Sequence, residues 1–73
     1  LRLQAAERAV ATMLADLGRD GARIAVAARM DERRGQLVRV TVGGAPAAAR
    51  AALEQALGSR LAPLTIAHEI AWE

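Results

Sequence analysis

Residues 23–42, RIAVAARMDERRGQLVRVTV, decide the fold of this chain. On both sides of a polar segment ending in Gly35, larger apolar residues alternate with polar or smaller ones. Such alternation is typical of strands with one buried face, and the glycine suits a turn with positive φ. We therefore predict a hairpin of strands 23–30 and 36–42 around the loop 31–35. The side chains expected to face inward are Ile24, Val26, Ala28, Met30, Val38, Val40 and Val42.

The segment before the hairpin has the pattern of an amphipathic helix. Apolar residues recur at positions 3, 6, 10, 13 and 17. This spacing places them on one helical face. We expect a helix over residues 3–17, ended by Gly18 in a C′-like position.

A second helix and a last strand are expected after the hairpin. Pro46 suits the first turn of a helix, which we expect over residues 47–57, with Gly58 either ending or kinking it. After Pro63, residues 64–72 alternate again, so that Ile66, His68, Ile70 and Trp72 share one face. Pro63 closes the short connector between this helix and the strand.

The expected order is helix, strand, strand, helix, strand. A hairpin followed by a helical crossover favours an α+β, αββαβ two-layer sandwich, with both helices on one face of a three-stranded sheet. Residues 1–73 then form a single domain. Because the chain starts at Leu1 in a helical pattern, we expect it to be part of a longer protein.

Composition excludes several classes of protein. The chain has no cysteine, which rules out disulfide-stapled scaffolds and cysteine zinc modules. All ten basic residues are arginine and the net charge is only +2, so the high pI of 11.0 does not by itself imply nucleic acid. A chain of this length builds a thin core, which favours dependence on a partner or a twin.

The candidate catalytic residues do not form a site. His68 is the only histidine and Ser59 the only serine, so no nucleophilic triad can form. His68 and Glu69 are adjacent in a strand and point to opposite faces, which argues against a shared metal. Asp31 and Glu32 lie beside arginines in a turn. We therefore expect no enzymatic activity, no cofactor and no metal.

A protein interface is expected on the outward face of the sheet. Small side chains flanked by charges would let another surface approach closely and would set its register. Trp72 is the one large aromatic and could act as a hot spot, although a core lid is the alternative. The expected interface residues are Ala25, Ala27, Leu37, Arg39, Ala67, Glu69, Ala71 and Trp72.

The αββαβ order of the whole chain resembles compact ferredoxin-like, ring-building modules of bacterial secretion-type and pilus-type membrane assemblies. The resemblance implies a non-enzymatic module for protein–protein interaction and oligomerisation. It also implies homodimers or rings, and membrane contact only through segments outside this chain. This is the main expectation, and it leaves localisation open.

Two alternatives remain. Residues Ala56-Leu57-Gly58 and the hairpin are similar to parts of the KH-type, ribosome-binding-factor-like RNA binders, which implies RNA contact through Arg29, Arg33, Arg34 and Arg39. The last strand, with His68-Glu69, resembles the dimerising cytosolic domain of cation diffusion facilitator transporters. That family's other metal ligands have no match here.

Overall fold

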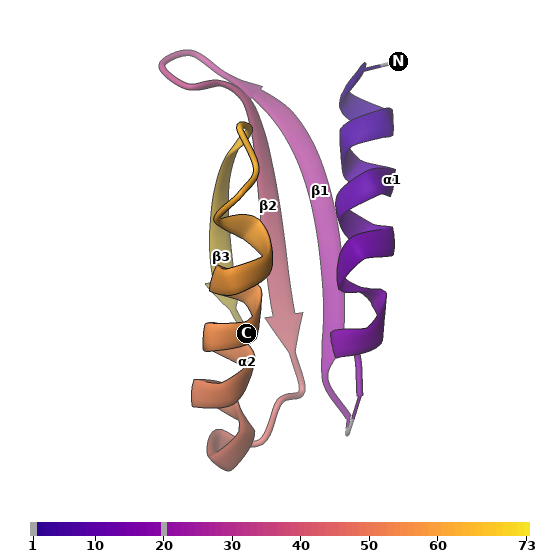
Figure 1. The fold of residues 1–73 in the computed structure, drawn as a ribbon, viewed down its shortest axis with the longest axis vertical. Helices are drawn as coiled ribbons and strands as arrows, with labels where there is room; N and C mark the ends of the chain where they lie inside the picture. The colour runs from indigo at the N-terminus through magenta and orange to yellow at the C-terminus, as the bar shows by residue number, and fades with distance from the viewer. Residues whose placement is uncertain (1, 20) are drawn as a thin grey trace.

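The computed structural model describes residues 2–19 and 21–73 (Figure 1). The elements are α1 (Arg2–Leu14), a 3₁₀ turn (Ala15–Leu17), β1 (Arg23–Asp31), β2 (Gly35–Gly43), α2 (Ala47–Leu61) and β3 (Ala67–Trp72). The predicted α+β class and element order are confirmed. Gly35 has φ 74°, as expected for the last residue of the hairpin loop.

The sheet is mixed, with the strand order β1-β2-β3. β1 pairs with β2 antiparallel, and β3 pairs with β2 parallel. Val40 lies opposite Val26 on one side and Ile70 on the other. The predicted faces of all three strands are therefore confirmed, because side chains alternate along each strand and the register fixes which ones share a face.

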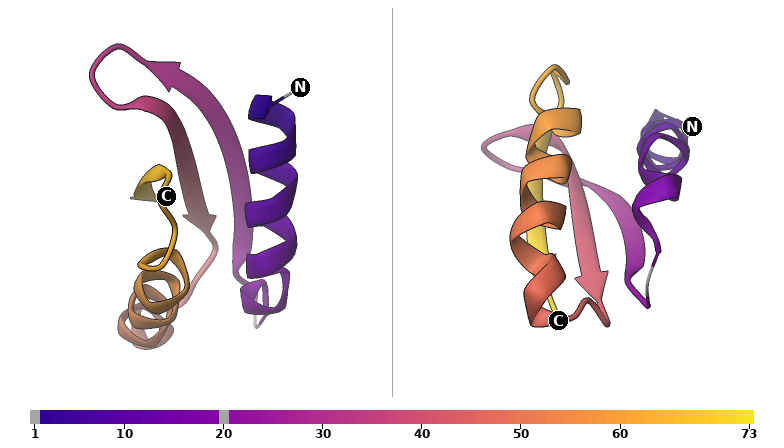
Figure 2. Two further views of the ribbon diagram at one scale, coloured as in Figure 1. Left: turned by 45° about the horizontal axis from the view of Figure 1, so that its top comes forward. Right: turned by 60° about the horizontal axis from the view of Figure 1, so that its bottom comes forward.

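The core forms on the face of β2 that carries Val38, Val40 and Val42. These valines make one buried cluster with Val10 and Leu14 of α1 and with Leu57 and Leu61 of α2. In Figures 1 and 2, α1 runs beside β1 and α2 lies over β3. β2 is thus the strand that both helices help to bury.

The first helical run ends at Gly18 as predicted, with residues 15–17 in a 3₁₀ turn and Gly18 as its C-cap at φ −79°. Two other predicted boundaries are wrong. α2 continues past Gly58 to Leu61, because one more turn buries Leu61 completely and outweighs the cost of about 1 kcal/mol for a helical glycine. β3 begins at Ala67 rather than at residue 64, since the chain is still turning where the Leu64 amide donates to the Leu61 carbonyl oxygen.

Two side chains exchange their expected burial. Met30 was expected in the core but is 66% exposed, because it holds the last inward position before the loop, where the hairpin projects past β3 and α2 (Figure 1). Leu37 was expected to be exposed on the outward face. It does lie on that face, yet it is 0% exposed.

Candidate interaction surface

The outer face is the side of the sheet opposite Val38, Val40 and Val42. By register it carries seven of the eight residues expected to form an interface: Ala25, Ala27, Leu37, Arg39, Ala67, Glu69 and Ala71. Among them, the two β1 alanines and Arg39 are exposed, the three β3 residues are half-buried and Leu37 is buried. Most of the expected residues are thus brought together on one accessible surface.

Trp72, the eighth residue, lies on the other face. It pairs with Val42 and packs against the core cluster. Arg50 of α2 places its guanidinium carbon 4.6 Å from the centre of the indole ring. This contact is a cation–π interaction. Trp72 thus lies on the face predicted for it, beside His68 and Ile70, and packs on the core as in the core-lid alternative.

Three arginines meet one carboxylate at the hairpin end of the outer face. Glu69 lies 3.1 Å from Arg39, 3.7 Å from Arg34 and 3.9 Å from Arg29. We call these four residues the Glu69 cluster. Asp31 adds a second carboxylate, 3.6 Å from Arg34. Three positive charges therefore face two negative ones, and the group keeps one net positive charge.

The Glu69 cluster explains the burial of Leu37. Arg29 is the β1 partner of Leu37, whereas Glu69 belongs to β3 on the far side of β2. To reach Glu69, the Arg29 side chain must cross β2 above Leu37. Long arginine side chains cover apolar surface with their methylene groups while keeping the charged end in water. Leu37 is therefore a buried support for the cluster, not an exposed contact.

The hairpin tip carries Arg33 and Arg34, two of the four arginines expected to contact RNA in the KH-type alternative. The backbone N–H groups of Arg34 and Arg33 donate to Asp31 Oδ2, at 3.0 and 3.1 Å. These hydrogen bonds hold the pKa of Asp31 below its usual value. Arg33 itself is exposed. Of the four arginines expected to contact RNA, three are thus already paired with Glu69.

One amide on the β1 edge of the sheet has a partner from α1. α1 lies along this edge (Figure 1), and Glu7 Oε2 accepts a hydrogen bond of 3.0 Å from the Ala28 N–H. A blocked edge amide cannot pair with another strand. This role of Glu7 was not predicted from the sequence. The only available signal was an acid on the flank of an amphipathic helix next to an edge strand.

The β3 edge is open. Glu73 donates its N–H to the Val42 carbonyl oxygen, which fixes the direction of its amide toward β2. Amide directions alternate along a strand, so the N–H and C=O groups of His68, Ile70 and Trp72 point away from β2. Among residues 2–19 and 21–73, no hydrogen-bond partner occupies these groups.

Among the described residues, the polar contact of the His68 side chain is local. Its Nδ1 lies 3.3 Å from the Ile66 carbonyl oxygen, and its ring shares the face of Val38, opposite to Glu69. Within the described part of the chain, no three potential ligands gather at one point.

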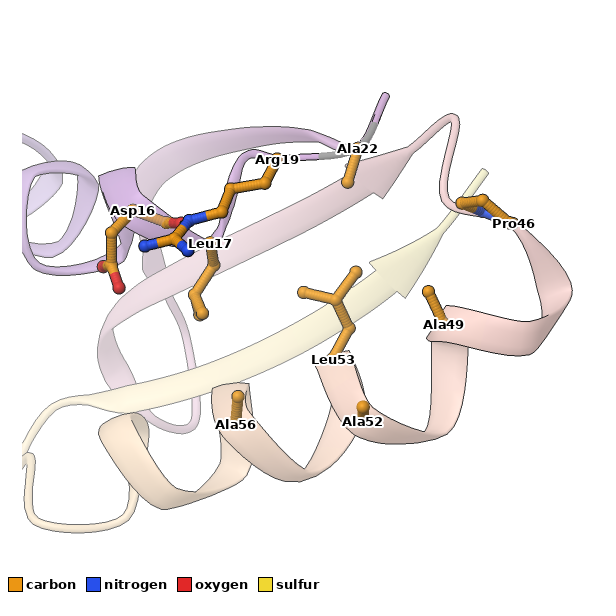
Figure 3. Close-up of a pocket in the computed structure, with 9 residues that line it drawn as sticks. All are labelled: Asp16, Leu17, Arg19, Ala22, Pro46, Ala49, Ala52, Leu53 and Ala56. Carbon is orange, nitrogen blue, oxygen red and sulfur yellow. The ribbon is translucent and has the colours of Figure 1, made fainter.

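A groove of about 360 Å³ separates the end of α1 from α2 (Figure 3). Leu17 and Leu53 point into it, and Ala49, Ala52 and Ala56 line its α2 side. Asp16, which lines the groove, forms a bidentate pair with Arg60, whose Nη2 lies 2.7 Å from Oδ2. Arg60 also donates to the Met13 carbonyl oxygen at 2.9 Å. The Arg60 hydrogen bond holds the Asp16 pKa below its usual value. The carboxylate that lines the groove is thus tied to structure.

Comparisons with protein-family models, with curated proteins and with solved structures found no match for this chain. Over the described residues, neither helix has the length and apolar character needed to cross a membrane.

Proposed function

We propose that this chain is a non-enzymatic module that associates with itself and with a larger bacterial assembly of the secretion or pilus type. In this proposal the domain has two layers, with α1 and α2 together on one face of the sheet. The outer face is then left for protein contacts. Any attachment to a membrane would come from segments outside this chain.

One observation carries the proposal: the accessible parts of the sheet combine small side chains, a fixed charge cluster and an open strand edge. The short side chains of Ala25 and Ala27 project little from the outer face, so that another protein surface can approach closely. The Glu69 cluster beside them holds its charges at defined positions, which favours one register of contact.

The same cluster argues for a protein partner over RNA. Phosphate contacts need guanidinium groups that are free to leave their carboxylates, and each neutralised phosphate adds to a steep salt dependence. Arg29, Arg34 and Arg39 share Glu69 instead. We therefore propose no RNA function.

Solution mass tests the proposal. Sedimentation equilibrium of the chain, from low to high micromolar concentration, is expected to show a reversible rise from monomer to dimer mass. Little dependence on salt is expected if the contacts are apolar and backbone-mediated. A monomer mass at every concentration would count against self-association and would remove the main support for this function.

A further inference from the structure

We infer that two copies of this chain pair through their β3 edges. The two β3 strands run antiparallel, with Ile70 opposite Ile70 of the second copy, and form one continuous sheet. This inference rests on the proposed self-association and names its site. The outer face is not the contact in this arrangement; the two outer faces join into one larger surface.

The backbone selects this register. The outward amide groups of β3 belong to His68, Ile70 and Trp72, a set that is symmetric about Ile70. With Ile70 at the twofold axis, His68 faces Trp72 of the second copy, and every outward N–H and C=O of the set finds a partner. Any register shifted by two residues leaves part of the set unpaired, although the side chains still match in face.

The outer-face charges select the same register. With Ile70 at the axis, Glu69 lies opposite Ala71 of the second copy. A shift of two residues in one direction would place Glu69 opposite its own equivalent, and a shift in the other would place it opposite Glu73. Like charges directly opposite each other destabilise a strand pair. Of these three registers, only the one centred on Ile70 avoids such a clash.

The Glu69 cluster gains a complementary charge in this dimer. Glu73 of the second copy lies opposite Ala67, next to the cluster. The cluster together with Asp31 carries three positive and two negative charges, so one further carboxylate brings the group to neutrality. Among the described residues of one copy, the Glu73 carboxylate makes an exposed contact with Arg23 at 3.8 Å, which costs little to exchange.

A proline substitution tests the edge directly. His68→Pro removes one outward N–H and leaves the ladder with β2 intact, and proline is tolerated on edge strands in this orientation. The matched control, His68→Ala, keeps the N–H. His68→Pro is expected to weaken the dimer by about tenfold or more relative to His68→Ala, with far-UV circular dichroism showing that both variants are folded.

A third variant separates the inference from the proposed function. Ala27→Arg adds a large charged side chain on the outer face at β1, far from the β3 edge. Edge pairing predicts no loss of dimer. If Ala27→Arg abolishes the dimer while His68→Pro does not, the copies associate through their outer faces, so the inference fails and the proposed function stands. If the unsubstituted chain is monomeric throughout, both fail.

Disulfide trapping tests the register without weakening the edge. The chain has no native cysteine. Opposite residues in a non-hydrogen-bonded antiparallel pair have Cα atoms about 4.5 Å apart, which permits a disulfide. A mixture of the Glu69→Cys and Ala71→Cys chains should therefore form a cross-linked heterodimer on mild oxidation. Each chain alone places its two thiols diagonally, at about 7–8 Å, and should cross-link much less.

The control mixture combines Ala67→Cys with Ala71→Cys. These positions face each other only in the register that puts Glu69 against its equivalent. Weak cross-linking of this mixture, together with strong cross-linking of the first, is the expected result. Stronger cross-linking of the control mixture, or equal cross-linking of both, would overturn the assigned register.

Discussion

The two edges of the sheet differ in what lies beside their outward backbone groups. β1 is paired with β2 by a short hairpin, and α1 lies beside it with Glu7 on the Ala28 amide. β3 reaches β2 only after a helical crossover, and the described residues leave its outer amides without partners. An edge left open invites pairing with another chain, whereas a capped edge prevents it. This difference in the described residues is what the proposed pairing through β3 rests on.

The largest effect should come from removing a leucine that packs α2 on the buried valines of β2. Leu61 is fully buried, so Leu61→Ala is expected to cost about 2–5 kcal/mol of unfolding free energy. Urea unfolding followed by circular dichroism measures this loss. For a domain of this size it is enough to unfold much of the population.

Leu14→Ala is the matched change on the α1 side, because Leu14 is equally buried. Hydrogen exchange should show that Leu61→Ala exposes the β3 amides first, since β3 depends on β2 and α2 alone. In Leu14→Ala, β1 should stay protected by its hairpin with β2. If β1 and β3 lose protection equally in each variant, the two edge strands do not differ in how strongly they depend on their helices.

A smaller effect is expected from opening the β1 edge. Glu7→Ala removes the acceptor of the Ala28 N–H and leaves that half-buried donor unpaired, at a cost of about 1 kcal/mol. The variant should also associate beyond the dimer, because β1 would then offer a second open edge. Light scattering at high concentration measures this. Glu7→Gln keeps an acceptor oxygen and should behave like the unsubstituted chain.

The smallest effect concerns the ion pair between Asp16, in the 3₁₀ turn after α1, and Arg60 of α2. The Arg60 hydrogen bond lowers the pKa of Asp16 below its ordinary value of 3.8. A carboxyl with a lowered pKa in the folded state stabilises the fold above its unfolded pKa, and this stability is lost as the pH falls through the folded pKa. Unfolding of the chain should therefore become easier in acid below about pH 4, where an unfolded Asp titrates.

Asp16→Asn should remove that part of the acid dependence and should be slightly less stable at neutral pH. Thermal unfolding at a series of pH values measures both. The pair is partly exposed, so the difference should shrink in high salt. If the stability of Asp16→Asn falls in acid as steeply as that of the unsubstituted chain, the Arg60 contact has no effect on stability.

Much of the fold was predictable because the decisive signals are local. Alternation in residues 23–42 depends only on side-chain period, so it placed both strands, their faces and the Gly35 turn. The end of α2 was missed because the burial of Leu61 is a tertiary effect that overrides the preference of Gly58. The exchange of Met30 and Leu37 was missed for a similar reason, since it depends on how far the hairpin projects and where the arginines turn.

The candidate surface was predictable as a set of positions but not as a structure. The same alternation grouped Ala25, Ala27, Ala67 and Ala71 on one face. It could not show that Arg29, Arg34 and Arg39 converge on Glu69, because strand order and register across β3 are not encoded in any local pattern. Nor could it show that one edge is capped by Glu7 and the other is open, although this difference carries the inference about pairing.

The parallel pairing of β3 with β2 also bears on how the chain folds. A hairpin closes through nearby residues and forms within microseconds, but a parallel neighbour has to wait for a crossover to be made first. α1, β1 and β2 can therefore assemble while α2 and β3 are still unstructured. During that interval one flank of β2 has no neighbour, and the valines at positions 38, 40 and 42 are only partly covered. We therefore expect the docking of β3 to be the late step of folding, and a chain caught before it to be prone to aggregate.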